Sequence, residues 1–254
     1  MGISLWLVSL GDRVVIGYFL TSRDVAIYSA AYALAGILGG LAAPFWGPLY
    51  PLMAQNKNEG DRGGIAAVCR KYTSAYFLVG FPALVGLTLI APRLVRLLGT
   101  NEFTINPLVF GLIALGLFLD QFTAIAHYLI YLHDEPIFLR NVMVASGMFN
   151  LAMNVATVPR FGIAGAAATT LLTYGLISGL LFQRLKRYGF TLREIYDLTL
   201  ARKFLLSSLG MGGIILLGGS ACGTWPSMGR LVLMGAGSYA ILIWTSSGFR
   251  LPRI

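Results

Sequence analysis

Long apolar runs separated by short polar connectors dominate the chain. A bilayer core about 30 Å thick needs about 20 mostly apolar residues per helix, and the pattern predicts eight such spans. Their approximate ranges are 2–20, 25–54, 66–91, 106–131, 138–158, 162–183, 203–221 and 229–247. None of these runs alternates apolar and polar residues as the strands of an outer-membrane barrel do. The sequence therefore predicts an all-α, polytopic membrane helix bundle of about eight transmembrane helices.

Turn-forming residues mark several places where these helices should end or bend. The segment from Pro159 to Gly162 predicts a tight turn between the fifth and sixth spans. Pro44, Pro48 and Pro51 cluster near the end of the second span, where each removes a backbone hydrogen bond and tends to bend the helix. Such a bend suits a transporter helix that flexes or lines a cavity. It equally suits a helix that leaves the membrane there, since the second and third spans are longer than the bilayer.

The composition excludes several classes of protein. Hydrophobic residues make up 57% of the 254-residue chain and charged residues only 11%, whereas a soluble domain carries roughly 25% charged residues. So little charge cannot cover a water-facing surface, which excludes a soluble enzyme and a nucleic-acid-binding protein. His127 and His133 lack the i, i+4 spacing of a helical zinc site. No motif supplies a nucleophile with a base, and we expect a protein that is not an enzyme and has no cofactor or metal.

The net charge of +9 is distributed unevenly over the connectors. If the chain starts in the cytoplasm and crosses eight times, the cytoplasmic side collects thirteen of the 19 Lys and Arg residues and the opposite side five, while Arg13 lies within the first span. Basic residues favour cytoplasmic loops. This pattern predicts a multi-pass protein of the cytoplasmic (inner) membrane with both termini in the cytoplasm. The basic segment 184–203 is expected to lie against anionic membrane lipids, to set the topology, or to do both.

Six polar residues fall deep within three of the predicted spans. They are Asp12, Arg13, Asp120, Gln121, Asn150 and Asn154. Ionisable groups are costly inside a bilayer and commonly mark functional sites. One hypothesis is a water-filled central cavity in which Arg13 pairs with a phosphate and the carboxylates take a proton or a sodium ion. The alternative is that Asp12 and Arg13 neutralise each other while the amides hydrogen-bond between helices as packing contacts.

Four segments of the chain resemble one family of membrane transporters. They are GDRVVIGYFLTSRDVAIYSAAYALA at 11–35, PLYPLMA at 48–54, FPALVGLTLIAPRLVRLLG at 81–99 and NLAMNVATVPRFGIAGAAATTLLTYG at 150–175. The last of these is the most specific. Through them the chain resembles the polysaccharide and O-antigen (lipid-linked oligosaccharide) flippases of the multidrug/oligosaccharidyl-lipid/polysaccharide exporter superfamily. The eight spans resemble the C-terminal lobe of a fourteen-helix flippase.

The resemblance implies an organisation and a set of partners. Residues 1–183 would form a six-helix C-terminal transporter lobe, and residues 184–254 a basic cytoplasmic loop plus two terminal transmembrane helices. The N-terminal six-helix lobe would be missing from this chain. Because a lone lobe cannot form a cavity between two lobes, we expect a fragment or a chain that pairs with another carrying the first lobe. Asp12 and Arg13 would face the central cavity by analogy with the family.

The function implied is movement of undecaprenyl-pyrophosphate-linked oligosaccharide across the cytoplasmic membrane by alternating access. The pathway would be polysaccharide biosynthesis, such as that of O-antigen and lipopolysaccharide. Membrane lipids, and a glycan polymerase or glycosyltransferases, would be further partners. Two alternatives stay open: a cation-coupled multidrug or small-molecule antiporter, and a non-transporting partner subunit of a glycan-assembly complex.

Overall fold

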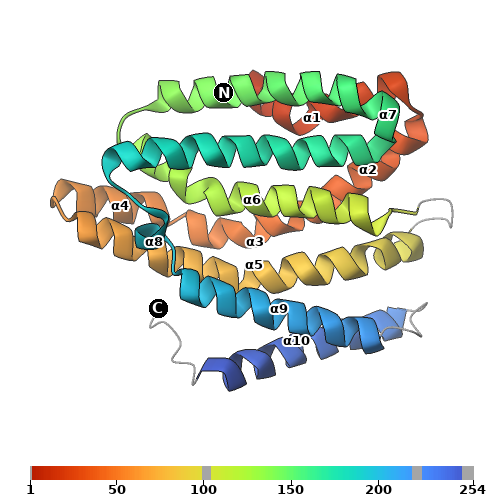
Figure 1. The fold of residues 1–254 in the computed structure, drawn as a ribbon. Helices are drawn as coiled ribbons and strands as arrows, with labels where there is room; N and C mark the ends of the chain where they lie inside the picture. The colour runs from red at the N-terminus through yellow and green to blue at the C-terminus, as the bar shows by residue number, and fades with distance from the viewer. Residues whose placement is uncertain (1, 99–103, 219–224, 248–254) are drawn as a thin grey trace.

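The protein, seen in a computed structural model that describes residues 2–98, 104–218 and 225–247, is a bundle of long helices (Figure 1). All regular structure within these ranges is helical, which confirms the predicted all-α class. The first helices are α1 (Gly2–Phe19), α2 (Ser22–Ala35), α3 (Ile37–Trp46) and α4 (Leu49–Asn58). They are followed by α5 (Arg62–Leu98), α6 (Pro107–Leu132), α7 (Pro136–Leu185), η1 (Lys186–Tyr188), α8 (Leu192–Ile195), α9 (Leu198–Gly218) and α10 (Trp225–Ser247).

The predicted second span is a helix broken in two places. It begins with a capping box, in which Thr21 Oγ1 accepts a hydrogen bond from Asp24 N (3.3 Å) and Asp24 Oδ2 accepts one from Thr21 N (3.1 Å). The interruption between α3 and α4 lies at Gly47 and Pro48, within the predicted proline cluster, and the backbone of both residues stays in the helical region. The sequence analysis did not predict the break at Gly36, between α2 and α3.

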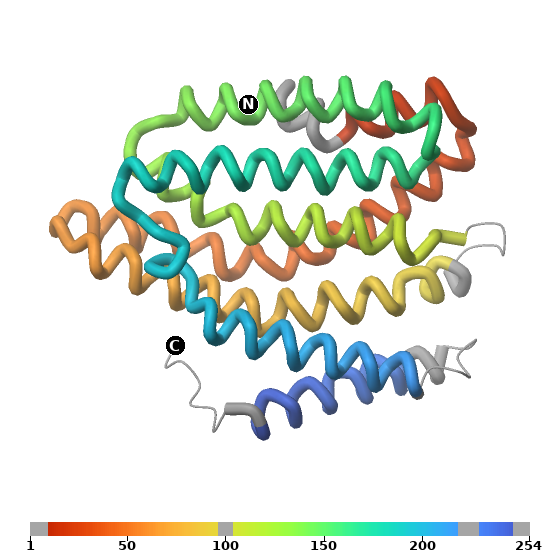
Figure 2. The backbone as a smooth tube through the Cα atoms, viewed as in Figure 1, coloured from red at the N-terminus to blue at the C-terminus, as the bar shows by residue number. Residues whose placement is uncertain are grey.

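The single element α7 contains the predicted fifth and sixth spans. Gly162 has φ 60° and ψ −146°, a conformation open essentially to glycine alone. The chain reverses there, and the two halves of α7 run antiparallel beside each other (Figure 2). At Gly165 a Cβ would lie 2.8 Å from the carbonyl oxygen of Thr157, so the two halves approach closely just after the turn. The predicted tight turn from Pro159 to Gly162 is therefore confirmed.

The apolar helices are long enough to cross a membrane several times. Five helical stretches have the length and composition of membrane spans: Ser22–Asn58, Arg62–Val95, Pro107–Leu132, Pro136–Tyr188 and Leu198–Leu217. The fourth of these folds back at Gly162 and so supplies two crossings, and Gly229–Thr245 is a shorter apolar helix. The protein is therefore a multi-pass membrane protein. At 37 residues, α5 is about 55 Å long, so it extends beyond a bilayer core as predicted.

Successive membrane spans alternate in direction, with α2, α3 and α4 together forming one span, and this sorts the connectors to two ends of the bundle (Figure 1). We call one of them the basic end; it carries connectors 59–61, 133–135 and 186–197, at the left of Figure 1. The turns at 20–21 and 159–162 lie at the opposite end.

Between the two ends, stacked aromatic rings of α5 and α6 form part of the core, and the centres of the Phe77 and Phe122 rings lie 5.9 Å apart. Tyr196, just before α9, stacks on Phe122 at 4.5 Å and joins the same core.

Candidate functional site

Asp12 and Arg13 form a charged pair on α1. The Asp12 side chain is fully buried, and its Oδ1 accepts a hydrogen bond from Arg13 N (2.8 Å) and lies 3.7 Å from Arg13 Nη1. Asp12 Oδ2 makes no hydrogen bond to the residues that the structure describes. The Arg13 side chain keeps 20% of its surface exposed. The pair therefore places a buried anion against a partly accessible cation, an arrangement that neutralises charge but leaves the guanidinium reachable.

Helix α2 fixes the position of the Arg13 guanidinium. Arg13 Nε donates a hydrogen bond to Ser29 Oγ (3.1 Å). The guanidinium carbon lies 4.7 Å from the centre of the Tyr32 ring, which is within the range of a cation–π interaction. Ser29 and Tyr32 are three residues apart and share one face of α2. A guanidinium held by several neighbours loses little further freedom when it binds an anion, so it is organised for binding in advance.

Two tyrosines connect this pair to the second half of α7. The Tyr28 hydroxyl lies 3.0 Å from Thr170 Oγ1, and the Tyr32 and Tyr174 hydroxyls lie 3.2 Å apart. Tyr28 also neighbours the Asp12 carboxylate. We call the resulting group the arginine cluster; it consists of Asp12, Arg13, Tyr28, Ser29, Tyr32, Thr170 and Tyr174. It joins the consecutive helices α1 and α2 to the distant helix α7.

The two candidate residues of α6, Asp120 and Gln121, lie beside this cluster. Gln121 Nε2 donates a hydrogen bond to Asp120 Oδ2 (3.0 Å), and Gln121 Oε1 accepts one from Trp46 Nε1 (3.1 Å). The Asp120 carboxylate is near enough to Tyr32 and Tyr174 to act on their hydroxyls electrostatically. A second carboxylate thus lies next to the arginine cluster, on the side where the Tyr32 and Tyr174 hydroxyls meet.

Asn150 and Asn154 have different surroundings. Both are buried, with exposed fractions of 1% and 0%. Asn150 Nδ2 donates to Thr173 Oγ1 (3.0 Å), and Asn154 Nδ2 donates to Asn150 Oδ1 (2.9 Å). The bond to Thr173 links the two antiparallel halves of α7, and the bond between the asparagines joins neighbouring turns of the first half. The structure thus joins the two asparagines to each other and to Thr173, in the way interhelical packing contacts do.

A group of side chains at the basic end holds its connectors together, and the sequence analysis did not predict it. Arg184 binds the Glu135 carboxylate with two hydrogen bonds, 2.6 Å from Nε and 2.5 Å from Nη2, and this contact lowers the pKa of Glu135. The His133 ring stacks on that of Tyr188 at 4.1 Å. The Tyr196 hydroxyl donates to the Phe122 carbonyl oxygen (2.6 Å), and burial raises the pKa of this phenol well above its ordinary value.

The tyrosines of the arginine cluster also escaped the sequence analysis. Aromatic residues in an apolar span are indistinguishable by composition from ordinary core residues. One signal is present in retrospect: Tyr28 and Tyr32, and likewise Thr170 and Tyr174, are spaced i, i+4, which places each pair of hydroxyls on one helix face.

The chain is similar to known proteins of glycan biosynthesis. Residues 1–106 match a family described as "Polysaccharide biosynthesis protein". Over 165 residues the chain is 25% identical to the probable low-salt glycan biosynthesis flippase Agl15 of Haloferax volcanii, covering 65% of this chain and 35% of that protein. Over 245 residues it is 23% identical to the probable flippase AglR of the same organism, covering 94% of this chain and 51% of that protein.

The fold is similar to that of a solved transporter. The structure of lipid II flippase MurJ in an inward closed conformation aligns with a TM-score of 0.67 at 14% sequence identity. The alignment covers 98% of this chain and 53% of that one. The chain thus spans about half the length, or less, of these relatives. The chain is thus similar in sequence to proteins of polysaccharide biosynthesis and to probable glycan flippases, and similar in fold to a lipid II flippase.

Proposed function

We propose that this chain is one lobe of a membrane transporter that flips a lipid-linked oligosaccharide, and that it is not an enzyme. The observation that carries the proposal is the alignment with the probable flippase AglR, which runs through nearly the whole chain rather than through one motif. The fold it shares with lipid II flippase MurJ is consistent with this, because that alignment also covers nearly the whole chain.

The proposal has a specific form. Residues 1–183 are the six-helix C-terminal lobe, and residues 184–254 supply a basic loop and two terminal helices. The lobe works by alternating access with an N-terminal six-helix lobe that this chain does not contain. The transporter lies in the cytoplasmic membrane, with both ends of this chain in the cytoplasm. Its substrate is an undecaprenyl-pyrophosphate-linked oligosaccharide of polysaccharide biosynthesis, such as O-antigen synthesis, received from glycosyltransferases or passed to a glycan polymerase.

The arginine cluster is the proposed place of contact with the pyrophosphate. A planar guanidinium can donate two parallel hydrogen bonds to a phosphate, and Arg13 is held by Ser29 and Tyr32 with part of its surface exposed. Asp12 balances its charge when no substrate is present. Movement of the substrate phosphate onto Arg13 weakens that pairing, so the Asp12 carboxylate can take up a proton or a sodium ion. Asp120 and Gln121 extend the proposed cavity set, whereas Asn150 and Asn154, which bind Thr173 and each other, take the packing role that the sequence left as the alternative.

The test uses this chain joined to, or expressed with, a first lobe that supports glycan export. Arg13→Ala should lower surface glycan and raise the pool of lipid-linked oligosaccharide inside the cell, while the amount of protein in the membrane stays the same. Arg160→Ala is the matched control, because Arg160 is an exposed arginine at the end opposite the basic end. Unchanged export in Arg13→Ala would contradict the assigned role of Arg13.

A second candidate function, a cation-coupled small-molecule antiporter, is favoured by one observation. Asp12 Oδ2 is buried and has no hydrogen-bond partner in the described part of the chain, as suits a carboxylate that binds a proton or a cation. Transport driven by a sodium or pH gradient, lost in Asp12→Asn and Asp120→Asn and independent of any lipid-linked glycan, would support the antiporter. Dependence on lipid-linked glycan would support the flippase.

A further inference from the structure

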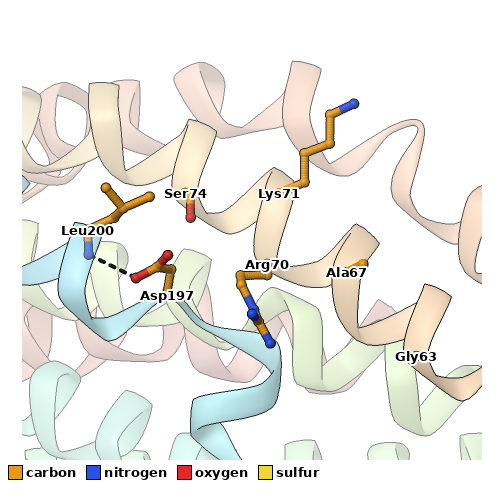
Figure 3. Close-up of a pocket in the computed structure, with 7 residues that line it drawn as sticks. All are labelled: Gly63, Ala67, Arg70, Lys71, Ser74, Asp197 and Leu200. Atoms are coloured by element: carbon orange, nitrogen blue, oxygen red, sulfur yellow. Dashed lines mark hydrogen bonds between the residues drawn. The ribbon is translucent and has the colours of Figure 1, made fainter. Parts of the chain in front are cut away.

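A hollow at the basic end lies between α5 and the start of α9 (Figure 3). It has a volume of about 530 Å³ and is lined by Arg70, Lys71 and Asp197 together with small and apolar residues of α5 and α9. A second hollow of about 380 Å³ shares Arg70 and Asp197 with it and adds Arg193. The two form one depression that contains three cationic side chains and one carboxylate.

The carboxylates near this depression are already engaged. Asp197 Oδ1 accepts hydrogen bonds from Thr199 N (3.1 Å) and Leu200 N (3.0 Å), so it caps the N-terminus of α9. The bond to Leu200 is drawn in Figure 3. The Glu194 carboxylate lies 3.5 Å from Arg62 and accepts a hydrogen bond from Thr191 N (2.7 Å). Neither carboxylate is paired with a cation that lines the depression, and the local field is therefore positive.

The cations themselves are placed to receive an anion. Arg70 donates from Nε (3.4 Å) and Nη2 (3.2 Å) to the Glu194 carbonyl oxygen, which fixes its guanidinium at the junction of the two hollows. Lys71 extends from the rim, away from Asp197 in Figure 3, on a flexible stem that can turn toward the hollow. Lys71 and Arg193 make no hydrogen bond or ion pair with residues in the described ranges. Lys203 lies one turn beyond Leu200 on the same face of α9.

The surroundings identify the ligand as an amphiphile. The depression lies where two apolar helices begin, within the stretches Arg62–Val95 and Leu198–Leu217. Farther along, α9 exposes further apolar side chains, such as Leu206 at 56%. A phosphate in the depression would leave its attached acyl chains beside the apolar stretches of these two helices. Basic pockets of this kind between membrane helices bind anionic lipid headgroups.

We propose that this depression, formed by Arg70, Lys71, Arg193 and the first turn of α9, binds the headgroup phosphate of an anionic phospholipid. The site is separate from the arginine cluster, since α1 and α7 lie on one side of the bundle and α9 and α10 on the other (Figure 1). It concerns a lipid that stays in its leaflet, so it holds whether or not the chain flips a glycan. The bound lipid ties the connector before α9 to α5.

The experiment uses the full chain purified in detergent, titrated with phosphatidylglycerol and, separately, with phosphatidylcholine or inorganic phosphate. Thermal stability and native mass spectrometry report binding. Lys71→Glu/Arg193→Glu should lower the apparent affinity for phosphatidylglycerol by about tenfold or more, because each basic residue near an anionic surface contributes on the order of a fivefold effect. The control Arg140→Glu/Arg187→Glu changes the net charge equally with exposed residues at the same end that do not line the depression, and its affinity should stay within about twofold of the parent chain.

Lys71→Gln/Arg193→Gln is the milder variant for the case in which the charge reversal impairs folding, and it should still lower the affinity several-fold. An equal loss of affinity in both double Glu variants would mean that only overall charge matters, and would overturn the site. Equal stabilisation by phosphatidylcholine, or by inorganic phosphate without lipid, would overturn the assignment of the ligand.

Discussion

Two groups of polar residues lie within apolar helices of this protein, and their surroundings differ. Asn150 and Asn154 are buried and bind each other and Thr173, all within α7. Arg13 is charged, 20% exposed, and held by Asp12 and by residues of α2. The comparison teaches that polarity in a membrane span has at least two uses. A buried amide with local partners stabilises a hairpin, whereas a charge held by several helices and left accessible is suited to bind a ligand.

Energetics support that distinction. An interhelical hydrogen bond between neutral side chains in a membrane contributes about 0.6 kcal/mol on average and about 1–2 kcal/mol at most. A charged side chain at the centre of a bilayer costs about 2.5–3.5 kcal/mol or more. The pairing with Asp12 offsets part of that cost for Arg13, but an apolar residue would avoid it entirely. Fold stability alone therefore does not explain an arginine at this position.

The largest expected effect comes from changing the shape of the cation while its charge is retained. Arg13→Lys keeps the charge but loses the planar fork and the contact with the Tyr32 ring. We expect glycan export per transporter to fall about tenfold or more, as loss of a hydrogen bond to a charged group does. Export assays on the two-lobe protein, normalised to the amount in the membrane, measure this. Arg160→Lys should have no effect, and equal export by Arg13→Lys would show that charge alone suffices.

A substitution at the turn of α7 tests how much the backbone conformation there contributes to the stability of the hairpin that contains Asn150 and Asn154. Gly162→Ala places a Cβ on a residue with φ 60° and ψ −146°, and the free energy of unfolding should fall by about 1–3 kcal/mol. Gly175→Ala is the control, because Gly175 is in a helix and a Cβ there meets nothing within 4 Å. It should raise stability by about 0.5–1 kcal/mol. Thermal unfolding in detergent distinguishes the two, and similar melting temperatures would contradict the strained turn.

Removing an asparagine should have a smaller effect, on stability alone. Asn150→Ala removes the hydrogen bonds to Thr173 and to Asn154, and we expect a loss of about 1 kcal/mol. Export per folded molecule should stay the same. Asn141→Ala, at an exposed position near the start of α7, is the matched control for both readouts. Loss of export without loss of stability would move Asn150 from the structural group to the functional one.

The smallest expected effect is on the stability contributed by an ion pair at the basic end. This end contains neither the arginine cluster nor the asparagine pair. Arg184 holds the pKa of Glu135 below its ordinary value of 4.5. The ion pair therefore stabilises the folded chain fully above that value, and its contribution is lost as the pH falls through the lowered pKa of the folded state. Glu135→Gln should lower the melting temperature slightly at pH 7 and show a weaker loss of stability than the parent chain as the pH falls below 4.5. Asp134→Asn, which changes a carboxylate that is 92% exposed, should leave the melting temperature nearly unchanged. A pH profile of Glu135→Gln identical to that of the parent would rule out this contribution.

Much of the fold could be predicted from the sequence, because membrane spans are recorded in local composition. The turn at Gly162 and the helix interruption at Pro48 follow from residues whose backbone preferences act locally. The break at Gly36 could not be predicted, since glycine is common in membrane helices that stay intact. The α8 segment and its contacts also escaped prediction, because they depend on partners far away in sequence, such as Glu194 with Arg62.

The candidate site could be predicted only in part. Asp12 and Arg13 stand out because few charges lie within the spans. The sequence alone did not show that Tyr32 would lie against Arg13 or that Asn150 would bind Thr173. Those contacts come from the packing of α1 against α2 and from the fold-back of α7 on itself. Pairing of distant helices is set by the sum of many small contacts, which no single spacing in the sequence reveals.

The most direct measurement compares Arg13→Ala with Asn150→Ala in the same two-lobe protein and the same cells. Export of glycan is divided by the amount of folded transporter for each variant. We predict that Arg13→Ala keeps its folded amount and loses most of its export, while Asn150→Ala loses some folded protein and keeps its export per molecule. Equal export per molecule in the two variants would contradict the assignment of separate roles to the arginine cluster and the asparagine pair.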